Sequence, residues 1–256
     1  MKKIVFAEGN NEIIRKATER SKNICEPLLL NGDLVEATKM VANGDADAII
    51  AGLDHTSRDV ILAIRDNIGM RQDVQTFSGM FVCDMPDGRR YIIADGAACK
   101  NPTTEQLIDI VTLVSHAAKK LLTEEPRIAM LSFSTFGSGG NDASIDKIHE
   151  AVQLTREQNP ELLIDGEMQL DAAIDSRIAQ KKGSNNSPVA GQANILITPE
   201  INSGNILVKA IEQFGGAIVA GPILLGFKSV TSDMSRGMNL EDAILTIKCV
   251  VDLLEH

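Results

Sequence analysis

The fold is decided by residues 128–165, IAMLSFSTFGSGGNDASIDKIHEAVQLTREQNPELLID. The apolar run at 128–133 predicts a buried strand, and the Ser- and Gly-rich segment after it predicts a loop. Residues 144–157 then predict a helix, and residues 162–165 predict a second strand. A strand–helix–strand unit joins parallel strands, whose helices cover the sheet. This stretch therefore predicts an α/β protein.

The same alternation runs through the rest of the chain. Further strands are expected at 3–7, 47–52, 76–83, 90–95, 193–197 and 217–221. Further helices are expected at 12–17, from 104 to about 122, at 205–214 and from 239 onward. Pro86-Asp87-Gly88 predicts a hairpin turn between 76–83 and 90–95. Thr103 and Gln106 have the spacing of a capping box.

Uniformly apolar strands separated by helices predict two three-layer α/β/α lobes with mostly parallel sheets and a cleft between them. We place the first lobe at residues 1–67 plus 232–256 and the second at 68–231. Ligands of such sheets bind beyond the carboxyl ends of the strands, so loops at those ends are the candidate sites.

Composition excludes several classes of protein. The 256 residues are 44% hydrophobic and 23% charged, which is an ordinary globular mixture. A net charge of −10 disfavours binding to nucleic acid or to an anionic membrane, and 3% aromatic residues disfavour base stacking. No apolar stretch is long enough to cross a bilayer, and the apolar run at 4–7 is too short for a secretory signal, so a cytoplasmic location is expected. The four scattered cysteines are expected to be reduced thiols.

Residues 132–142, SFSTFGSGGND, form the first candidate site. Hydroxyls and glycines before a helix allow backbone N–H groups to converge on an anion. The segment is neither a GxxxxGK[ST] loop nor a GxGxxG fingerprint. A flexible turn with a polar N-cap accounts for the same composition.

Residues 231–242, TSDMSRGMNLED, form the second candidate site. Asn239 is expected to cap the last helix and to place Asp242 in its first turn, where the helix dipole favours a carboxylate. Ser235 and Arg236 lie on the loop that leads in, and a guanidinium matches a phosphate group in bidentate fashion. An ordinary N-cap with a surface arginine is the alternative.

The acidic segment 163–173 offers a third candidate, with Asp165, Glu167 and Asp171 as metal ligands or acid–base groups. No histidine lies near them in the sequence, so structural caps and ion pairs are the alternative, and no metal site is predicted. The histidines form no HxxH or HExxH pattern: His55, His116, His149 and His256. Of these, His55 alone is expected near the cleft.

Seven segments, taken together and in order, resemble the phosphate acetyltransferase/phosphate butyryltransferase family. They are residues 94–107, 131–138, 165–173, 187–191, 202–205, 221–224 and 235–237. The resemblance covers most of the chain from Gly52 onward, with the His55 stretch and Asp242 added to the seven.

The resemblance implies the reaction acyl-CoA + phosphate ⇌ acyl phosphate + CoA, in a homodimer, with CoA as a substrate and with neither metal nor cofactor. It implies that Asp242 takes the thiol proton, Ser235 stabilises the oxyanion and Arg236 neutralises the leaving phosphate. It also implies a set of substrate-binding residues: His55, Ser134, Thr135, Gly137, Ser138 and Asn205.

The chain departs from the family pattern in two places. Only residues 1–47 precede the strand at 48–52, so a shortened first lobe is expected. Leu62 stands where the family commonly has an arginine, and Arg58 or Arg65 could compensate. These departures keep open a catalytically weakened, CoA-binding relative, and a butyryl-type acyl preference is open as well. A dehydrogenase on a similar sheet is disfavoured because no GxGxxG is present.

Overall fold

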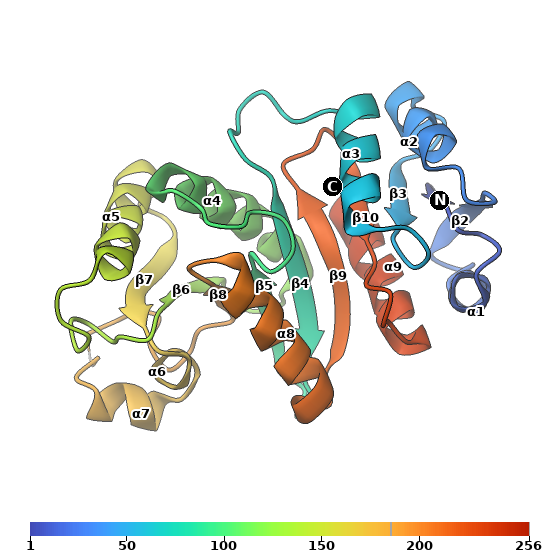
Figure 1. The fold of residues 1–256 in the computed structure, drawn as a ribbon. Coiled ribbons are helices and arrows are strands. Elements are labelled where there is room, and N and C mark those ends of the chain that lie inside the picture. The colour runs from blue at the N-terminus through green and yellow to red at the C-terminus, as the bar shows by residue number, and fades with distance from the viewer. Residues whose placement is uncertain (185, 256) are drawn as a thin grey trace.

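The computed structural model describes residues 1–184 and 186–255, and His256 lies outside them. The described residues form ten strands and nine helices (Figure 1). The strands are β1 (Lys2–Phe6), β2 (Cys25–Leu29), β3 (Ala48–Ala51), β4 (Ser78–Asp84), β5 (Arg90–Ala94), β6 (Arg127–Leu131), β7 (Leu163–Met168), β8 (Ile195–Ile197), β9 (Ile218–Leu225) and β10 (Val230–Asp233). The helices are α1 (Glu12–Arg20), α2 (Leu34–Asn43), α3 (Ser57–Asn67), α4 (Thr104–Leu121), α5 (Ala143–Gln158), α6 (Leu170–Ile174), α7 (Ser176–Lys181), α8 (Ile201–Gly215) and α9 (Leu240–Leu254).

All ten strands belong to one sheet, in the order β2-β1-β3-β10-β9-β4-β5-β8-β6-β7. The block β2-β1-β3-β10 and the block β5-β8-β6-β7 are each parallel throughout. Antiparallel pairs of β10 with β9, β9 with β4 and β4 with β5 connect the blocks. The expected α/β class with a mostly parallel sheet is therefore confirmed.

The sheet differs from expectation at the junction of the two blocks, where two separate sheets were expected and one continuous sheet is found. β10 makes the connection, because Thr231 pairs with Ile49 of β3 on one side and with Leu224 of β9 on the other. The sequence VTSD of β10 is short and polar, so it gives no strand pattern on its own. The division into 1–67 plus 232–256 and 68–231 stays a prediction.

Helices cover both faces of the sheet, which gives the three expected layers. Alternation along β1 shows this arrangement: Ile4 and Phe6 pack with α1 and α9, whereas Val5 packs with α2 and α3. In the other block, α4 and α5 cover one face and α6 and α8 cover the other. Figure 1 shows β4 and β9 in the middle of the sheet, with the blue N-terminal helices and the yellow α5–α7 region on opposite sides of them.

Several local predictions are confirmed. β4 and β5 form the expected hairpin, with Val82 paired to Ile92. The Thr103 side chain accepts from the backbone of Gln106, and the Gln106 side chain accepts from that of Thr103. Along residues 1–184 and 186–255, no helix combines the length and apolar character needed to cross a bilayer.

Candidate active site

A cavity of about 490 Å³ opens where the carboxyl ends of β3 and β10 face the first turns of α8. Three predicted site residues line it, namely Asn205 of α8 and Ser235 and Arg236 of the loop after β10. Its wall also contains Gly52, Ser57, Lys209 and Asp233. The structure thus brings together residues separated by up to 184 positions in the chain, as the parallel pairing of β3 with β10 requires.

The loop with Ser235 and Arg236 is held at both ends by buried methionines. Met234 and Met238 are 1% and 5% exposed and pack in the same core cluster. The Met234 N–H donates to the carbonyl of Ala51 at 2.5 Å, and the Met238 N–H donates to the carbonyl of Ser235 at 2.9 Å. The pattern Met-Ser-Arg-Gly-Met therefore fixes the ends of a tight loop, and Ser235 and Arg236 face the cavity.

Lys209 is a cavity residue that the sequence analysis missed. Its ammonium donates to the hydroxyl oxygen of Ser235 at 3.3 Å and to the carboxylate of Glu212 at 2.7 Å. The available signal was its spacing, because residues four apart in a helix share a face and Lys209 follows Asn205 by four. Lys209 and Arg236 together place two cations at the cavity wall of a chain with a net charge of −10.

Asp242 lies beneath the loop and is not among the residues that line the cavity. The residue is 1% exposed, and its two side-chain oxygens accept N–H bonds from Val219 at 2.9 Å and Asn239 at 3.0 Å. The predicted N-cap at Asn239 is confirmed as part of a capping box with Asp242. Burial raises the pKa of Asp242 above its ordinary value. Its predicted role as proton acceptor stays a prediction.

His55 lies in the turn between Gly52 and Ser57, but its ring is not part of the cavity wall. Its Nδ1 contacts the carboxylate of Glu8 at 2.7 Å. Glu8 is 3% exposed and also accepts the backbone N–H groups of Gly52, Leu53, Asp54 and His55. The contact gives His55 a structural function in shaping this turn, and its predicted substrate contact stays a prediction.

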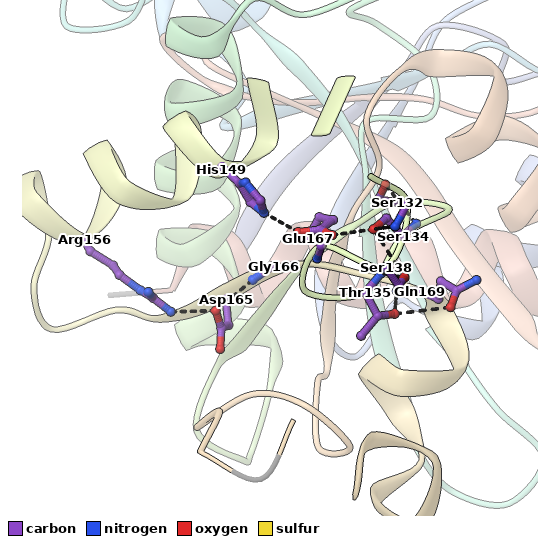
Figure 2. A network of polar contacts seen from close by, with 12 residues as sticks. Ser132, Ser134, Thr135, Ser138, His149, Arg156, Asp165, Gly166, Glu167 and Gln169 are labelled. Carbon is purple, nitrogen blue, oxygen red and sulfur yellow. Dashed lines mark hydrogen bonds and ion pairs between the residues drawn. The ribbon is translucent and has the colours of Figure 1, made fainter. Parts of the chain in front are cut away.

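The Ser- and Gly-rich loop after β6 is folded around a carboxylate of the protein itself (Figure 2). Oε1 of Glu167 accepts the Ser134 hydroxyl at 2.6 Å and the Gly137 N–H at 2.8 Å. His149 contacts the other oxygen. Burial alone raises the pKa of Glu167, but these hydrogen bonds outweigh it and leave the pKa below its ordinary value.

The remaining hydroxyls of this loop are bonded internally as well. Ser138 Oγ accepts the Thr135 N–H at 2.9 Å, and Thr135 Oγ1 accepts the Gln169 N–H at 3.0 Å. None of Ser134, Thr135, Gly137 and Ser138 is among the described residues that line the 490 Å³ cavity. Donors therefore converge in this loop, as expected from the sequence, but those of Ser134 and Gly137 bind the Glu167 carboxylate. Phosphate binding by the four residues stays a prediction.

Comparison with known proteins agrees with this architecture. The family described as phosphate acetyl/butaryl transferase matches residues 29–251. The chain is 38% identical over 228 residues to the phosphate acetyltransferase of Clostridium acetobutylicum, covering 87% of this chain and 68% of that protein. It is 38% identical over 226 residues to the phosphate acetyltransferase of Treponema pallidum, covering 86% of this chain and 66% of that protein.

This chain belongs to the phosphate acetyl/butaryl transferase family. A solved phosphotransacetylase from Streptococcus pyogenes superimposes with a TM-score of 0.87 at 29% identity, covering 99% of this chain and 94% of that one. The chain spans about two thirds of the length of the two curated relatives.

The family commonly has an arginine at the position of Leu62, so we asked which cations the cavity wall of this chain contains. Leu62, Arg58 and Arg65 all belong to α3, and the cavity wall in the described structure includes none of them. Arg65 is paired with Asp66 on the surface. Lys209 is the second cation that the cavity wall does contain.

The acidic side chains of residues 163–173 form ion pairs and hydrogen bonds within the protein. Asp165 pairs with Arg156 at 2.7 Å and Asp171 pairs with Lys182 at 2.7 Å, while Glu167 holds the loop after β6. In the described part of the chain, no three His, Cys, Asp or Glu side chains are grouped to hold a metal ion.

Proposed function

We propose that this protein is a phosphate acyltransferase that moves an acetyl or short acyl group between CoA and inorganic phosphate. The single observation that carries the proposal is the cavity in which Ser235, Arg236 and Lys209 lie together. An acidic protein needs such a local cluster of donors to capture an acyl phosphate against its overall charge.

Arg236 suits the leaving phosphate, because a planar guanidinium offers two parallel N–H donors to phosphate oxygens. Ser235 suits the developing oxyanion. Its oxygen accepts from Lys209 at 3.3 Å, which leaves the hydroxyl hydrogen free to donate to the acyl carbonyl oxygen. Removal of one donor of this kind usually costs about 10²–10³ in rate.

The incoming thiol must lose its proton, because the thiolate is the nucleophile. The resemblance assigns this proton to Asp242, whose oxygens both accept backbone N–H groups in the structure. Asp242 also holds the start of α9, so it positions the loop with Ser235 and Arg236. The chemistry that the resemblance implies uses no metal, and we expect treatment with a chelator to leave the rate unchanged.

The direct test mixes the protein with CoA and acetyl, propionyl or butyryl phosphate and follows thioester absorbance. We expect thioester formation with at least one of the three, and the ranking gives the acyl preference. Arg236→Ala should lower the rate by about 10²–10³. Arg177→Ala, which removes an exposed arginine outside the cavity wall, is the matched control and should keep it.

Absence of thioester with all three acyl phosphates would refute the proposal. If calorimetry then still showed CoA binding, the protein would be a CoA-binding relative without turnover, a possibility that Leu62 at the family arginine position motivates.

A homodimer and a cytoplasmic location complete the proposal, and the family resemblance supports the dimer. Light scattering coupled to gel filtration gives the mass in solution, and a mass of one chain would refute the dimer. Fractionation of cells that make the protein tests its location.

A further inference from the structure

A second cavity, of about 410 Å³, lies at the end of the sheet opposite to the candidate active site. Asp47 and Val230, at the amino ends of β3 and β10, line it. Gly52 and Asp233, at the carboxyl ends of the same strands, line the 490 Å³ cavity instead. The length of β10, about 10 Å at ~3.3 Å per residue, separates the two cavities. We call the second cavity the basal groove; it lies between α4, the end of α9 and the turn at residues 226–229.

The floor of the basal groove is apolar and buried. Leu224 and Phe227, near the end of β9 and in the turn after it, are 1% and 4% exposed. The Phe227 ring packs against the ring of Phe77, with the ring centroids 5.1 Å apart. Apolar side chains of α4 and α9 extend this surface, namely Leu113, Ala117, Leu253 and Leu254. The apolar part of a ligand can therefore be buried here.

Backbone hydrogen bonds hold the turn at 226–229 in place. The Arg71 N–H donates to the Gly226 carbonyl at 2.9 Å, and the Lys228 N–H donates to the Gly69 carbonyl at 3.0 Å. Gly226 has φ +97°, and a Cβ atom there would lie 2.9 Å from the carbonyl oxygen of Thr76. The fold therefore fixes the backbone of Arg71 and Lys228 beside the apolar floor.

The rim of the groove is positively charged. Arg71, Lys120 and Lys228 line it together with His116, and Asp47 is the one acid among its described lining residues. Because the whole chain carries a net charge of −10, this grouping of cations is a local reversal of the overall charge. A local positive patch of this kind attracts anions.

Two of these cations bind the protein and still have donors left. Nζ of Lys120 donates to the carbonyls of Leu253 at 2.9 Å and Glu255 at 2.6 Å, which uses two of its three N–H groups. Arg71 donates to Asp73 through Nε and Nη2, and a guanidinium has five N–H groups. One donor of Lys120 and three of Arg71 thus remain for a ligand.

The side chains of Lys228 and His116 are exposed and hold no hydrogen bond or ion pair within residues 1–184 and 186–255. His116 precedes Lys120 by four positions in α4, so the two share one face of the helix. Lys228 comes from the turn at 226–229. Donors therefore reach the rim from α4 and from the turn, which suits a single anionic group bound between them.

We propose that the basal groove is a binding site for a small organic anion with an apolar tail, of the class of aliphatic carboxylates and alkyl phosphates. Arg71, Lys120 and Lys228 hold the anionic head, and the tail lies on Leu224 and Phe227. A volume of 410 Å³ is that of a small-molecule site, and an apolar lining with a few polar groups is the usual composition of such sites. The site is separate from the acyl-transfer cavity and does not depend on the proposed function.

The test follows the histidine ring signals of the native protein by NMR during titration with octanoate and with octyl phosphate. The ring of His116 is in the groove, whereas His55 and His149 lie elsewhere and serve as internal references. We expect the His116 signal, assigned with His116→Gln, to shift and saturate with a Kd of about 1–10 mM or tighter. The tighter of the two probes identifies the preferred head group.

Two further ligands separate the charge of the rim from the apolar floor. Octanamide keeps the tail without the charge, and butyrate keeps the charge with a shorter tail. Each should bind at least about tenfold more weakly than octanoate, because loss of four buried methylene groups or of a charge-assisted contact costs at least that much.

Lys228→Glu reverses one rim charge at an exposed position and should weaken octanoate binding about three- to tenfold. Lys39→Glu, an equally exposed reversal on α2 outside the groove, is the matched control and should bind as the native protein does. Arg236→Ala removes a cation of the other cavity and should leave the octanoate affinity unchanged.

The inference is overturned if the His116 signal does not move with either probe, or if octanamide binds as tightly as octanoate. It is also overturned if Arg236→Ala abolishes binding while Lys228→Glu keeps it, because octanoate would then occupy the other cavity. A protein that forms no thioester can still show this binding, so failure of the proposed function is distinguishable.

Discussion

Two loops at the carboxyl ends of parallel strands invite comparison, one after β6 and one after β10. The first contains several serines and glycines and packs around the buried carboxylate of Glu167 from β7, and the second contains Ser235 and Gly237 and follows the buried Asp233 at the end of β10. Glu167 accepts three contacts from its own protein (Figure 2), whereas Oδ1 of Asp233 has no partner in the described structure. The first loop is thus part of a closed polar network, whereas the carboxylate before the second keeps one buried oxygen without a hydrogen-bond partner in the described structure.

The difference has a thermodynamic consequence. A carboxylate that accepts several hydrogen bonds stabilises the fold when it is ionised, and removal of its charge destabilises the protein. A buried carboxylate without partners costs stability when it is ionised, so removal of its charge stabilises the protein. Opposite signs are therefore expected for the two loops.

The largest effect is expected for Gly52→Ala, which places a Cβ atom against Asp233 and Met234. The strain of φ +110° adds to this overlap, so we expect a loss of about 3–5 kcal/mol in the free energy of unfolding. Gly88→Ala is the matched control: its φ is +87° and a Cβ there meets nothing within 4 Å, so strain alone should cost about 1–2 kcal/mol. Urea unfolding of both variants measures the difference, and equal losses would show that the contact with Asp233 is not tight.

Glu167→Ala should lower the free energy of unfolding by about 2–4 kcal/mol at pH 7, because the donors of Ser134 and Gly137 lose their buried acceptor. Since the folded pKa of Glu167 lies below its ordinary value, this stabilisation is present above about pH 4.5. It is lost as the pH falls through the folded pKa. Urea unfolding at pH 7 and at pH 3 measures both limits.

Glu167→Gln is the matched control for the loop after β6, because it keeps an oxygen in place for Ser134 and Gly137. It should cost about 1–2 kcal/mol. A loss as large as that of Glu167→Ala would show that the negative charge, and not the acceptor geometry, holds this loop.

Asp233→Asn should act in the opposite direction and stabilise the protein at pH 8. The folded pKa of about 6 exceeds the ordinary 3.8, so ionisation of Asp233 costs stability as the pH rises through this window. At 1.36 kcal/mol per pKa unit the full gain for Asp233→Asn is up to about 3 kcal/mol at pH 8, and it vanishes below about pH 3.8. A variant that is less stable than the native protein at pH 8 would mean that the carboxylate has a favourable partner.

Much of the fold is readable from the sequence because its strands are apolar along their whole length. β3 is AIIA and fully buried, and it stands out without any neighbour. β10 does not, because VTSD owes its place to pairing with β3 and β9. β2 is likewise hidden: it lies at the sheet edge and contains Pro27, a residue that edge strands tolerate.

The site residues that could be predicted from the sequence are those that stand in short, recognisable sequence motifs. Ser235, Arg236 and Asn205 stand in recognisable motifs, and the structure places them at one cavity. Lys209 has only its helical spacing from Asn205 as a sequence signal, and Asp233 has none, because an aspartate with one unpartnered oxygen looks like any other aspartate in a sequence. The Glu167 network shows the converse, since the sequence supplies the donors of the loop but does not reveal that a carboxylate 33 residues from Ser134 occupies them.

His149→Ala is expected to have the smallest effect, and it tests whether the closed network extends to its exposed end. The His149 side chain is 48% exposed, so water can replace its contact with Glu167, and we expect a loss of only about 1 kcal/mol at pH 7. His149→Gln retains a donor and should lose less. A double-mutant cycle with Glu167→Ala separates the pair from the rest of the loop: a coupling of about 0.5–1.5 kcal/mol is expected if the two side chains act together. Strict additivity would confine the network to Glu167, Ser134 and Gly137, and the contrast with Asp233 would then rest on two donors instead of three.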